Sequence, residues 1–154
     1  MVYASAARKS FIPQSKAIER FLAKRYNMMG TTDIESARID SICEYIRDFK
    51  TQYQKVRKLE GDDKVNGMNE WFNTTLVTNM TSLNEIVGTN NHSVGNELSL
   101  SDIVIYSFIN EFFDDKESSI RSIHNCNNII NIINHVSQHP LLITYFTNRK
   151  QTVF

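Results

Sequence analysis

The feature that most constrains the fold is the spacing of apolar residues, which repeats at three and four positions through most of the chain. This is the period of an α-helix that buries one face. Almost no segment alternates with the period of two that is typical of a half-buried strand. The 154 residues include only 2 prolines and 5 glycines, too few to favour a turn-rich sandwich or barrel. The sequence therefore predicts an all-helical, bundle-type fold.

Local signals place the first helices. One helix opens at Pro13-Gln14-Ser15 and stops at Gly30. A second begins after Thr32, because Glu35 follows at the spacing of a capping box. Residues 59–67 are interpreted as a polar connection, and a third long helix extends from residue 71 to about residue 88.

The sharpest start signal is a second capping box, Ser99 with Asp102, which we expect to be structural. Leu98 and Ile103 flank it at the spacing of a hydrophobic staple. Residues 114–117 then form a solvated break. Two shorter helices follow, around residues 129–136 and after Pro140.

Composition narrows the classes of function. The length fits one domain. The 17 basic and 17 acidic residues balance, so no net charge draws the chain to nucleic acid or to a membrane surface. No apolar run is long enough to cross a bilayer and no secretion signal is evident, which makes a cytoplasmic location the default. The two cysteines, Cys43 and Cys126, are expected to be small core side chains.

Three segments together resemble the cytosolic glutathione transferases. Residues 14–30 resemble the last helix of that family's thioredoxin-like domain, residues 94–103 the start of its central buried helix, and residues 139–142 a short proline-led helix. The likeness covers roughly residues 11–150 and is closest to the alpha, mu, pi and sigma group, with an alpha-like character. It implies a thioredoxin-like remnant at residues 1–30 and a glutathione transferase C-terminal helical domain at residues 31–154.

The resemblance also implies a function. A member of this family conjugates reduced glutathione to hydrophobic electrophiles, and glutathione is a co-substrate of the reaction, not a bound cofactor. The resemblance also implies a homodimer that acts in cytoplasmic detoxification. Most of the thioredoxin-like domain, which holds the thiol-activating residue, is missing from this sequence, and Tyr3 stands in the wrong context to replace it. We therefore assign no catalytic residue and expect no turnover by this chain alone. The alternative is a non-catalytic helical interaction module or a degenerate gene product.

Three positions carry over from the family as glutathione-binding residues. Gln14 and Ser15 match the pair that meets the γ-glutamyl end of glutathione, at a helix start where free N–H groups favour a carboxylate. Asp48 matches an acid that reaches into the neighbouring subunit's site toward the ligand's ammonium group. The alternatives stay open: Gln14 and Ser15 merely cap a helix, and Asp48 is a solvated helix charge.

Other constellations favour structural roles. His135 and His139 have a metal-ligand spacing but no evident third ligand, so we expect no metal site. Val153 and Phe154 are candidates for a terminal flap by position alone, and Arg20, Lys24 and Arg25 are interpreted as a solvated patch. A set of aromatic residues at helical spacing favours core packing over an apolar substrate wall: Tyr45, Tyr53, Trp71, Phe72, Tyr106, Phe108, Phe112 and Phe113.

Overall fold

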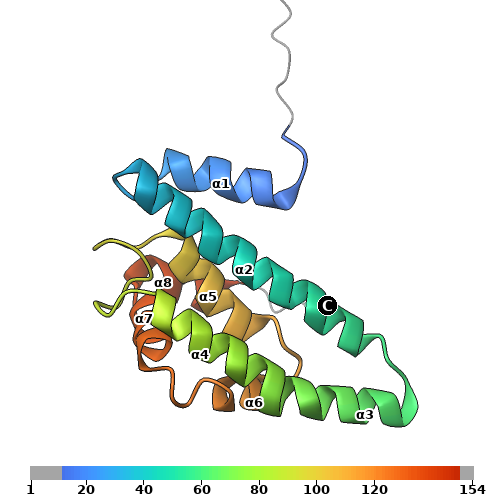
Figure 1. Ribbon diagram of the computed structural model, residues 1–154. Coiled ribbons are helices and arrows are strands. Elements are labelled where there is room, and N and C mark those ends of the chain that lie inside the picture. Colours follow the sequence, from blue (N-terminus) through green and yellow to red (C-terminus); the bar gives the residue numbers. More distant parts are fainter. Residues whose placement is uncertain (1–11, 150–154) are drawn as a thin grey trace, which may run out of the picture.

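The computed structural model describes residues 12–149, and all regular elements in that range are helical, which confirms the predicted all-helical bundle (Figure 1). Eight α-helices and one π-helical turn follow one another: α1 (Ser15–Arg25), α2 (Asp33–Arg57), α3 (Gly61–Glu70), η1 (Trp71–Thr75), α4 (Leu76–Ile86), α5 (Leu100–Glu111), α6 (Lys116–Arg121), α7 (Asn127–Ser137) and α8 (Pro140–Asn148). None of these helices is long and apolar enough to span a membrane.

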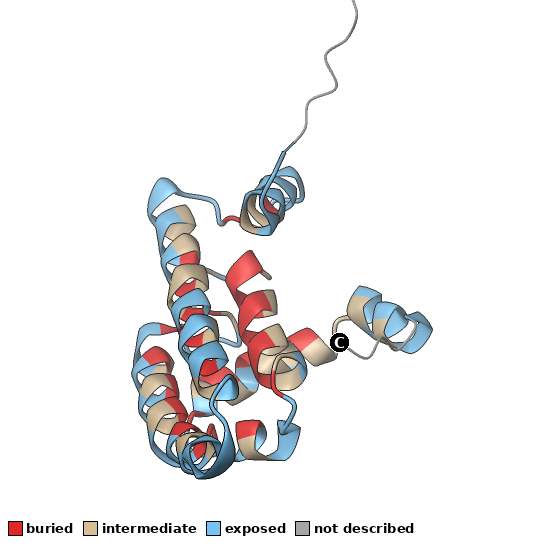
Figure 2. Ribbon diagram, turned by 90° about the vertical axis from the view of Figure 1, so that its right-hand side faces the viewer, coloured by how far each residue is buried: buried red, intermediate tan, exposed pale blue. Residues whose placement is uncertain are grey.

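Helix α5 is the central element of the bundle. It contacts α1, α2, α6 and α7, and most of its length is coloured as buried in Figure 2. Ile105, Phe108 and Ile109 are fully buried on this helix, against the apolar faces of α2 and α7. Burying such side chains stabilises a fold by about 1.5–3 kcal/mol each, so α5 contributes strongly to the core.

The start of α2 matches its sequence signal. The Thr32 hydroxyl accepts a hydrogen bond from the Glu35 amide at 3.1 Å, and the Glu35 carboxylate accepts from the Thr32 amide at 3.2 Å. The same carboxylate also accepts from the amide and hydroxyl of Thr31, both at 2.7 Å. The capping box predicted at Thr32 is therefore confirmed, and it fixes the turn that joins α1 to α2.

The prediction of a polar connection through residues 59–67 was wrong over most of its length. Helix α3 begins at Gly61 and runs through η1 into α4, as one nearly continuous rod. Asp62 and Asp63 lie in its first turn, where negative charge is favourable. Gly67 lies inside α3, and a Cβ there would lie 2.9 Å from Cδ1 of Leu59. In the sequence this glycine looked like a helix breaker.

A second difference lies in the expected break at residues 114–117. Asp115 is the N-cap of the short helix α6, and its carboxylate accepts a hydrogen bond from the Ser118 amide at 2.9 Å. These bonds lower the pKa of Asp115, with the Ser118 amide making the largest contribution. The solvated acidic stretch therefore includes a helix start.

The loop before α5 is held by a buried carboxylate. Asp102, which is fully buried, accepts hydrogen bonds from the amides of Ser93 at 2.6 Å and Ser99 at 2.7 Å. The Ser99 hydroxyl donates to the same carboxylate at 2.8 Å. These bonds tie the loop after α4 to the first turn of the central helix, a structural role for both Ser99 and Asp102.

Candidate functional site

Helix α1 carries two of the predicted glutathione-binding residues and packs with its apolar face outward. Ile18, Phe21 and Leu22 are 41%, 47% and 44% exposed, and only Ala23 of this helix is buried. Figure 2 shows α1 at one end of the bundle, with exposed residues along most of its length. Little of its apolar surface is therefore buried, and polar contacts join it to α2.

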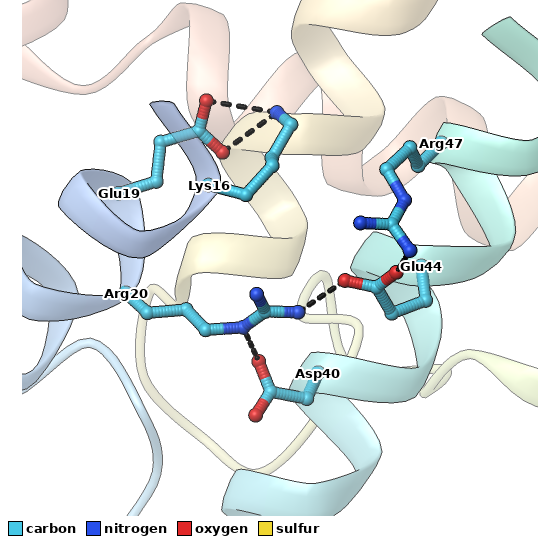
Figure 3. A network of polar contacts seen from close by, with 6 residues as sticks. All are labelled: Lys16, Glu19, Arg20, Asp40, Glu44 and Arg47. Carbon is cyan, nitrogen blue, oxygen red and sulfur yellow. Dashed lines mark hydrogen bonds and ion pairs between the residues drawn. The ribbon is translucent and has the colours of Figure 1, made fainter. Parts of the chain in front are cut away.

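Those contacts form the network of ion pairs in Figure 3. Arg20 of α1 donates to Asp40 at 2.6 Å and to Glu44, both on α2. Glu44 also pairs with Arg47, and Lys16 pairs with Glu19 at 2.7 Å within α1. The hydrogen bonds with Asp40 and then with Glu44 raise the pKa of Arg20. Of the three residues interpreted as a solvated patch, Arg20 is partly exposed and also pairs with α2, whereas Lys24 and Arg25 are exposed.

Gln14 and Ser15 lie together at the N-terminus of α1, and both are exposed. The backbone of Gln14 has φ 74° and ψ 120°, in the left-handed half of conformational space that non-glycine residues rarely occupy. Its carbonyl accepts from the amides of Ala17 and Ile18 at 3.1 Å, but its side chain caps no amide. The backbone carbonyl of Gln14, and not its side chain, thus accepts the hydrogen bonds at this helix start. The side-chain amide of Gln14 has no hydrogen-bond partner within residues 12–149.

Asp48 lies on α2 and is exposed. No hydrogen bond or ion pair joins it to Gln14 or Ser15 in the described part of the chain. The structure therefore does not bring the three predicted residues into one site within a single chain. A role for Asp48 in a neighbouring subunit, as the resemblance implies, stays a prediction.

The aromatic residues pack mainly as core, as the sequence favoured. Tyr53, Trp71, Phe72, Phe108 and Phe113 are buried. Tyr45, Tyr106 and Phe112 are only partly buried and pack against the edge of the core.

Lys50 was not singled out in the sequence. Its ammonium lies 5.0 Å from the centre of the Phe112 ring and 6.0 Å from that of Phe108. Burial, and then the positive charge of Lys16, lower the pKa of Lys50. An ammonium over two rings is a cation–π arrangement, and only the fold brings these residues of α2 and α5 together.

The cysteines and histidines show no catalytic arrangement. Burial raises the pKa of the Cys43 thiol to about 12, so it stays protonated and unreactive at neutral pH. The ring of His135 packs against that of His92, with centroids 4.7 Å apart, while His139 is the N-cap of α8. No group of three or more potential ligands among His, Cys, Asp and Glu gathers within residues 12–149. Tyr3, Val153 and Phe154 lie outside the described residues.

Comparisons with known proteins identify the family. The family model described as "Glutathione S-transferase, C-terminal domain" matches residues 47–149. The class-mu 28 kDa glutathione S-transferase of Schistosoma japonicum is 28% identical over 147 residues, covering 92% of this chain and 69% of its own. Human glutathione S-transferase Mu 3 is 28% identical over 110 residues, covering 70% of this chain and 48% of its own.

Solved structures show the same fold. The pi-class glutathione S-transferase of Onchocerca volvulus superposes with a TM-score of 0.77 and 19% identity, over 92% of this chain and 67% of that one. The monomeric enzyme Na-GST-3 of Necator americanus superposes with a TM-score of 0.78 and 24% identity, over 93% and 71%. With the profile match and the bundle, these findings place the chain in the glutathione S-transferase family.

Proposed function

We propose that the chain contributes the helical part of a glutathione transferase that conjugates reduced glutathione to hydrophobic electrophiles. In such a reaction the glutathione thiolate forms a C–S bond to an electrophilic carbon, and either a leaving group departs with the electron pair or a strained ring opens and takes up a proton. Catalysis needs a donor that lowers the pKa of the thiol, a clamp on the tripeptide and an apolar wall. Within residues 12–149, the proposed clamp is formed by Gln14, Ser15 and Asp48, and the proposed wall by the partly buried aromatic residues. We assign no thiol-activating donor there. The 154-residue chain alone is therefore expected to bind glutathione without turning it over.

The observation that carries this proposal is the start of α1. Gln14 holds a strained backbone conformation, and its side chain and that of Ser15 are exposed beside helix N–H groups that lack intrahelical acceptors. Strain of this kind is retained where function selects the side chain, because glycine would adopt the same conformation at less cost. A helix start with an amide and a hydroxyl suits the γ-glutamyl carboxylate of glutathione.

Titration calorimetry of the purified chain with reduced glutathione tests the clamp. Gln14→Gly is expected to raise the free energy of unfolding by relieving the backbone and to lower glutathione affinity about fivefold or more through the lost side chain. The matched control is Asn27→Gly, because Asn27 also has a positive φ, of 57°, but lies at the other end of α1. It is expected to gain stability with unchanged affinity.

The results separate the possibilities. If Gln14→Gly and Ser15→Ala both leave the affinity for glutathione unchanged, neither side chain binds glutathione. Asp48→Asn is expected to weaken binding only in a sample that sedimentation shows to be dimeric, since its proposed contact crosses to the other subunit. A conjugation assay with 1-chloro-2,4-dinitrobenzene tests turnover, and conjugation by the pure chain would contradict the expected inactivity.

Assembly and location follow from family membership as proposals. We propose a homodimer in the cytoplasm with a role in detoxification, supported by relatives that are glutathione transferases. A related structure is described as monomeric, so dimerisation needs its own measurement.

A second candidate function is a non-catalytic interaction module or degenerate product. The outward apolar face of α1, formed by Ile18, Phe21 and Leu22, favours it, since exposed apolar patches often mark protein contacts. A folded chain that binds no glutathione but associates through this face would support the module.

A further inference from the structure

Two histidines from distant parts of the sequence meet at the surface of the bundle. His92 lies in the loop before α5 and His135 in the last turn of α7, and both side chains are partly exposed. Their rings contact edge to face, with centroids 4.7 Å apart and an angle of 65° between the ring planes. Two imidazoles that bind one tetrahedral metal ion, at metal–nitrogen distances of about 2.0–2.1 Å, have ring centroids roughly 5 Å apart. The fold therefore holds these rings close to the separation that a shared metal ion needs.

The ring of His92 is oriented through its Nδ1 atom, which lies 3.1 Å from the carbonyl oxygen of Asn90. A carbonyl oxygen only accepts hydrogen bonds, so Nδ1 carries the proton, and Nε2 of the neutral ring then has a free lone pair. A histidine that binds a metal ion typically donates its other ring N–H to such an oxygen, because this bond fixes the tautomer and the orientation of the ring. His92 thus already has the outer hydrogen bond of a metal ligand.

The backbone is anchored beside both rings. Ser93, which follows His92, is fully buried, and its amide donates a hydrogen bond to the Asp102 carboxylate at 2.6 Å. Val136, which follows His135, is fully buried in the core. Only side-chain rotation is therefore needed to bring one nitrogen of each ring to a common ion, and the entropic cost of ordering the site is small.

The local charge distribution accepts a cation. Neither the loop of residues 88–96 nor helix α7 contains a lysine or an arginine. His135 lies near the C-terminal end of α7, where the helix dipole favours positive charge. The sequence offered His139 as the metal-binding partner of His135, but His139 is the N-cap of α8, and the fold instead places His92 against His135.

We infer that His92 and His135 form a binding site for a divalent transition-metal ion that prefers imidazole nitrogen, represented by Zn²⁺ and Cu²⁺. One nitrogen of each ring binds the ion. Water completes the coordination, because no group of three or more potential ligands gathers within residues 12–149. The ion has a structural role, since it joins the loop before α5 to α7. Neither histidine belongs to α1 or α2, so the inference does not rest on the proposed glutathione site.

Titration calorimetry with Zn²⁺ tests the site on the 154-residue chain, prepared without an affinity tag that binds metal itself. One ion per chain is expected, with tighter binding of Cu²⁺ and none of Mg²⁺. His92→Phe and His135→Phe each keep an aromatic ring and remove its nitrogens, and each is expected to weaken Zn²⁺ binding about tenfold or more. The matched control is His124→Phe, at an exposed histidine outside the pair, which is expected to leave the affinity unchanged.

Hydrogen exchange locates the link. Zn²⁺ is expected to slow exchange of the amides of residues 88–96 in the wild type and in His124→Phe, but not in His92→Phe. His92→Gln or His135→Gln replaces any phenylalanine variant that circular dichroism shows to be unfolded.

Three results would each overturn the proposal. The first is a folded chain that binds neither Zn²⁺ nor Cu²⁺, and the second is unchanged affinity in folded variants of both His92 and His135. The third is full binding in His92→Phe together with lost binding in His139→Gln, because the ion would then lie between His135 and His139.

Discussion

The hydroxyl of Tyr53 is a buried polar group without a hydrogen-bond partner in the described residues. The side chain is 1% exposed, and its ring lies 4.8 Å from that of Phe113 and 5.4 Å from that of Trp71. Burial raises the pKa of Tyr53 by disfavouring the charged form. The ring contributes packing, whereas the hydroxyl pays a desolvation cost with no compensating bond.

Tyr53→Phe is therefore expected to raise the free energy of unfolding by about 1 kcal/mol, because it removes an unsatisfied group and keeps the ring. Urea denaturation measures the change. Tyr53→Leu is the control for packing and is expected to lower stability by about 2 kcal/mol. A loss of stability in Tyr53→Phe would mean that a bound water satisfies the hydroxyl.

Glu35 shows how one carboxylate couples stability to pH. The hydrogen bonds from Thr31, amide first and hydroxyl second, lower the pKa of Glu35 in the folded chain. The carboxylate of Glu35 therefore takes up its proton more readily in the unfolded chain. Its contribution to the free energy of unfolding is complete above the unfolded pKa of about 4.3, and it is lost as the pH falls through the lower pKa of the folded chain.

Glu35→Gln is expected to lose stability at pH 7 and to show a smaller further loss than the wild type when the pH falls from 5 to 3. Thermal unfolding across this range measures the difference. Glu60→Gln is the control, because Glu60 is a helix N-cap whose side chain caps no amide. If the stability of the wild type and of Glu35→Gln falls in parallel from pH 5 to 3, Glu35 is not a source of this pH dependence.

At the scale of elements, the sequence predicts helices well where periodicity and caps agree. The long helix α2, the central helix α5 and the proline-led α8 all follow from such agreement. Helix α3 was missed because Gly61 and Gly67 outweighed a weak apolar pattern, and α3 buries no residue. Helix α6 was missed because six residues are too few for a periodic signal.

The candidate site was predictable only in part. Gln14 and Ser15 stand at a helix start, as the local sequence indicates. The pairing of Arg20 with Asp40 and Glu44 was not predictable, because the partners lie on a different helix, at sequence separations of 20 and 24 residues. Periodicity describes one helix at a time and does not specify which charged faces meet. The outward apolar face of α1 likewise depends on that pairing.

The turn between α1 and α2 yields a prediction about Gly30, which has φ 75°. A Cβ there would lie 2.5 Å from the Glu35 Cβ, so Gly30→Ala adds a clash to the conformational cost. The matched control is Gly61→Ala, where φ is 57° and a Cβ would meet nothing within 4 Å. We expect Gly61→Ala to cost about 1 kcal/mol and Gly30→Ala at least about 2 kcal/mol, measured by urea denaturation. Equal costs would show that Glu35 moves aside freely.

For the whole molecule, burial is uneven. The core gathers around α5, whereas α1, which ion pairs join to α2, is exposed along most of its length (Figure 2) and leaves Ile18, Phe21 and Leu22 exposed. Exposure of these apolar side chains to water does not stabilise a monomer. Burying them against another surface contributes roughly 25 cal/mol per Å² of apolar area, so the face favours association.

Light scattering after size exclusion tests whether this face joins chains. If it does, the average mass of the wild type rises with concentration, and the double variant Phe21→Gln, Leu22→Gln stays monomeric with unchanged helical content. Val65→Gln is the control, because Val65 is a comparably exposed apolar residue, 60% exposed, on α3. It is expected to associate like the wild type. A stable dimer in all three proteins would place the contact on another surface, and the α1 face would then be available to a different partner.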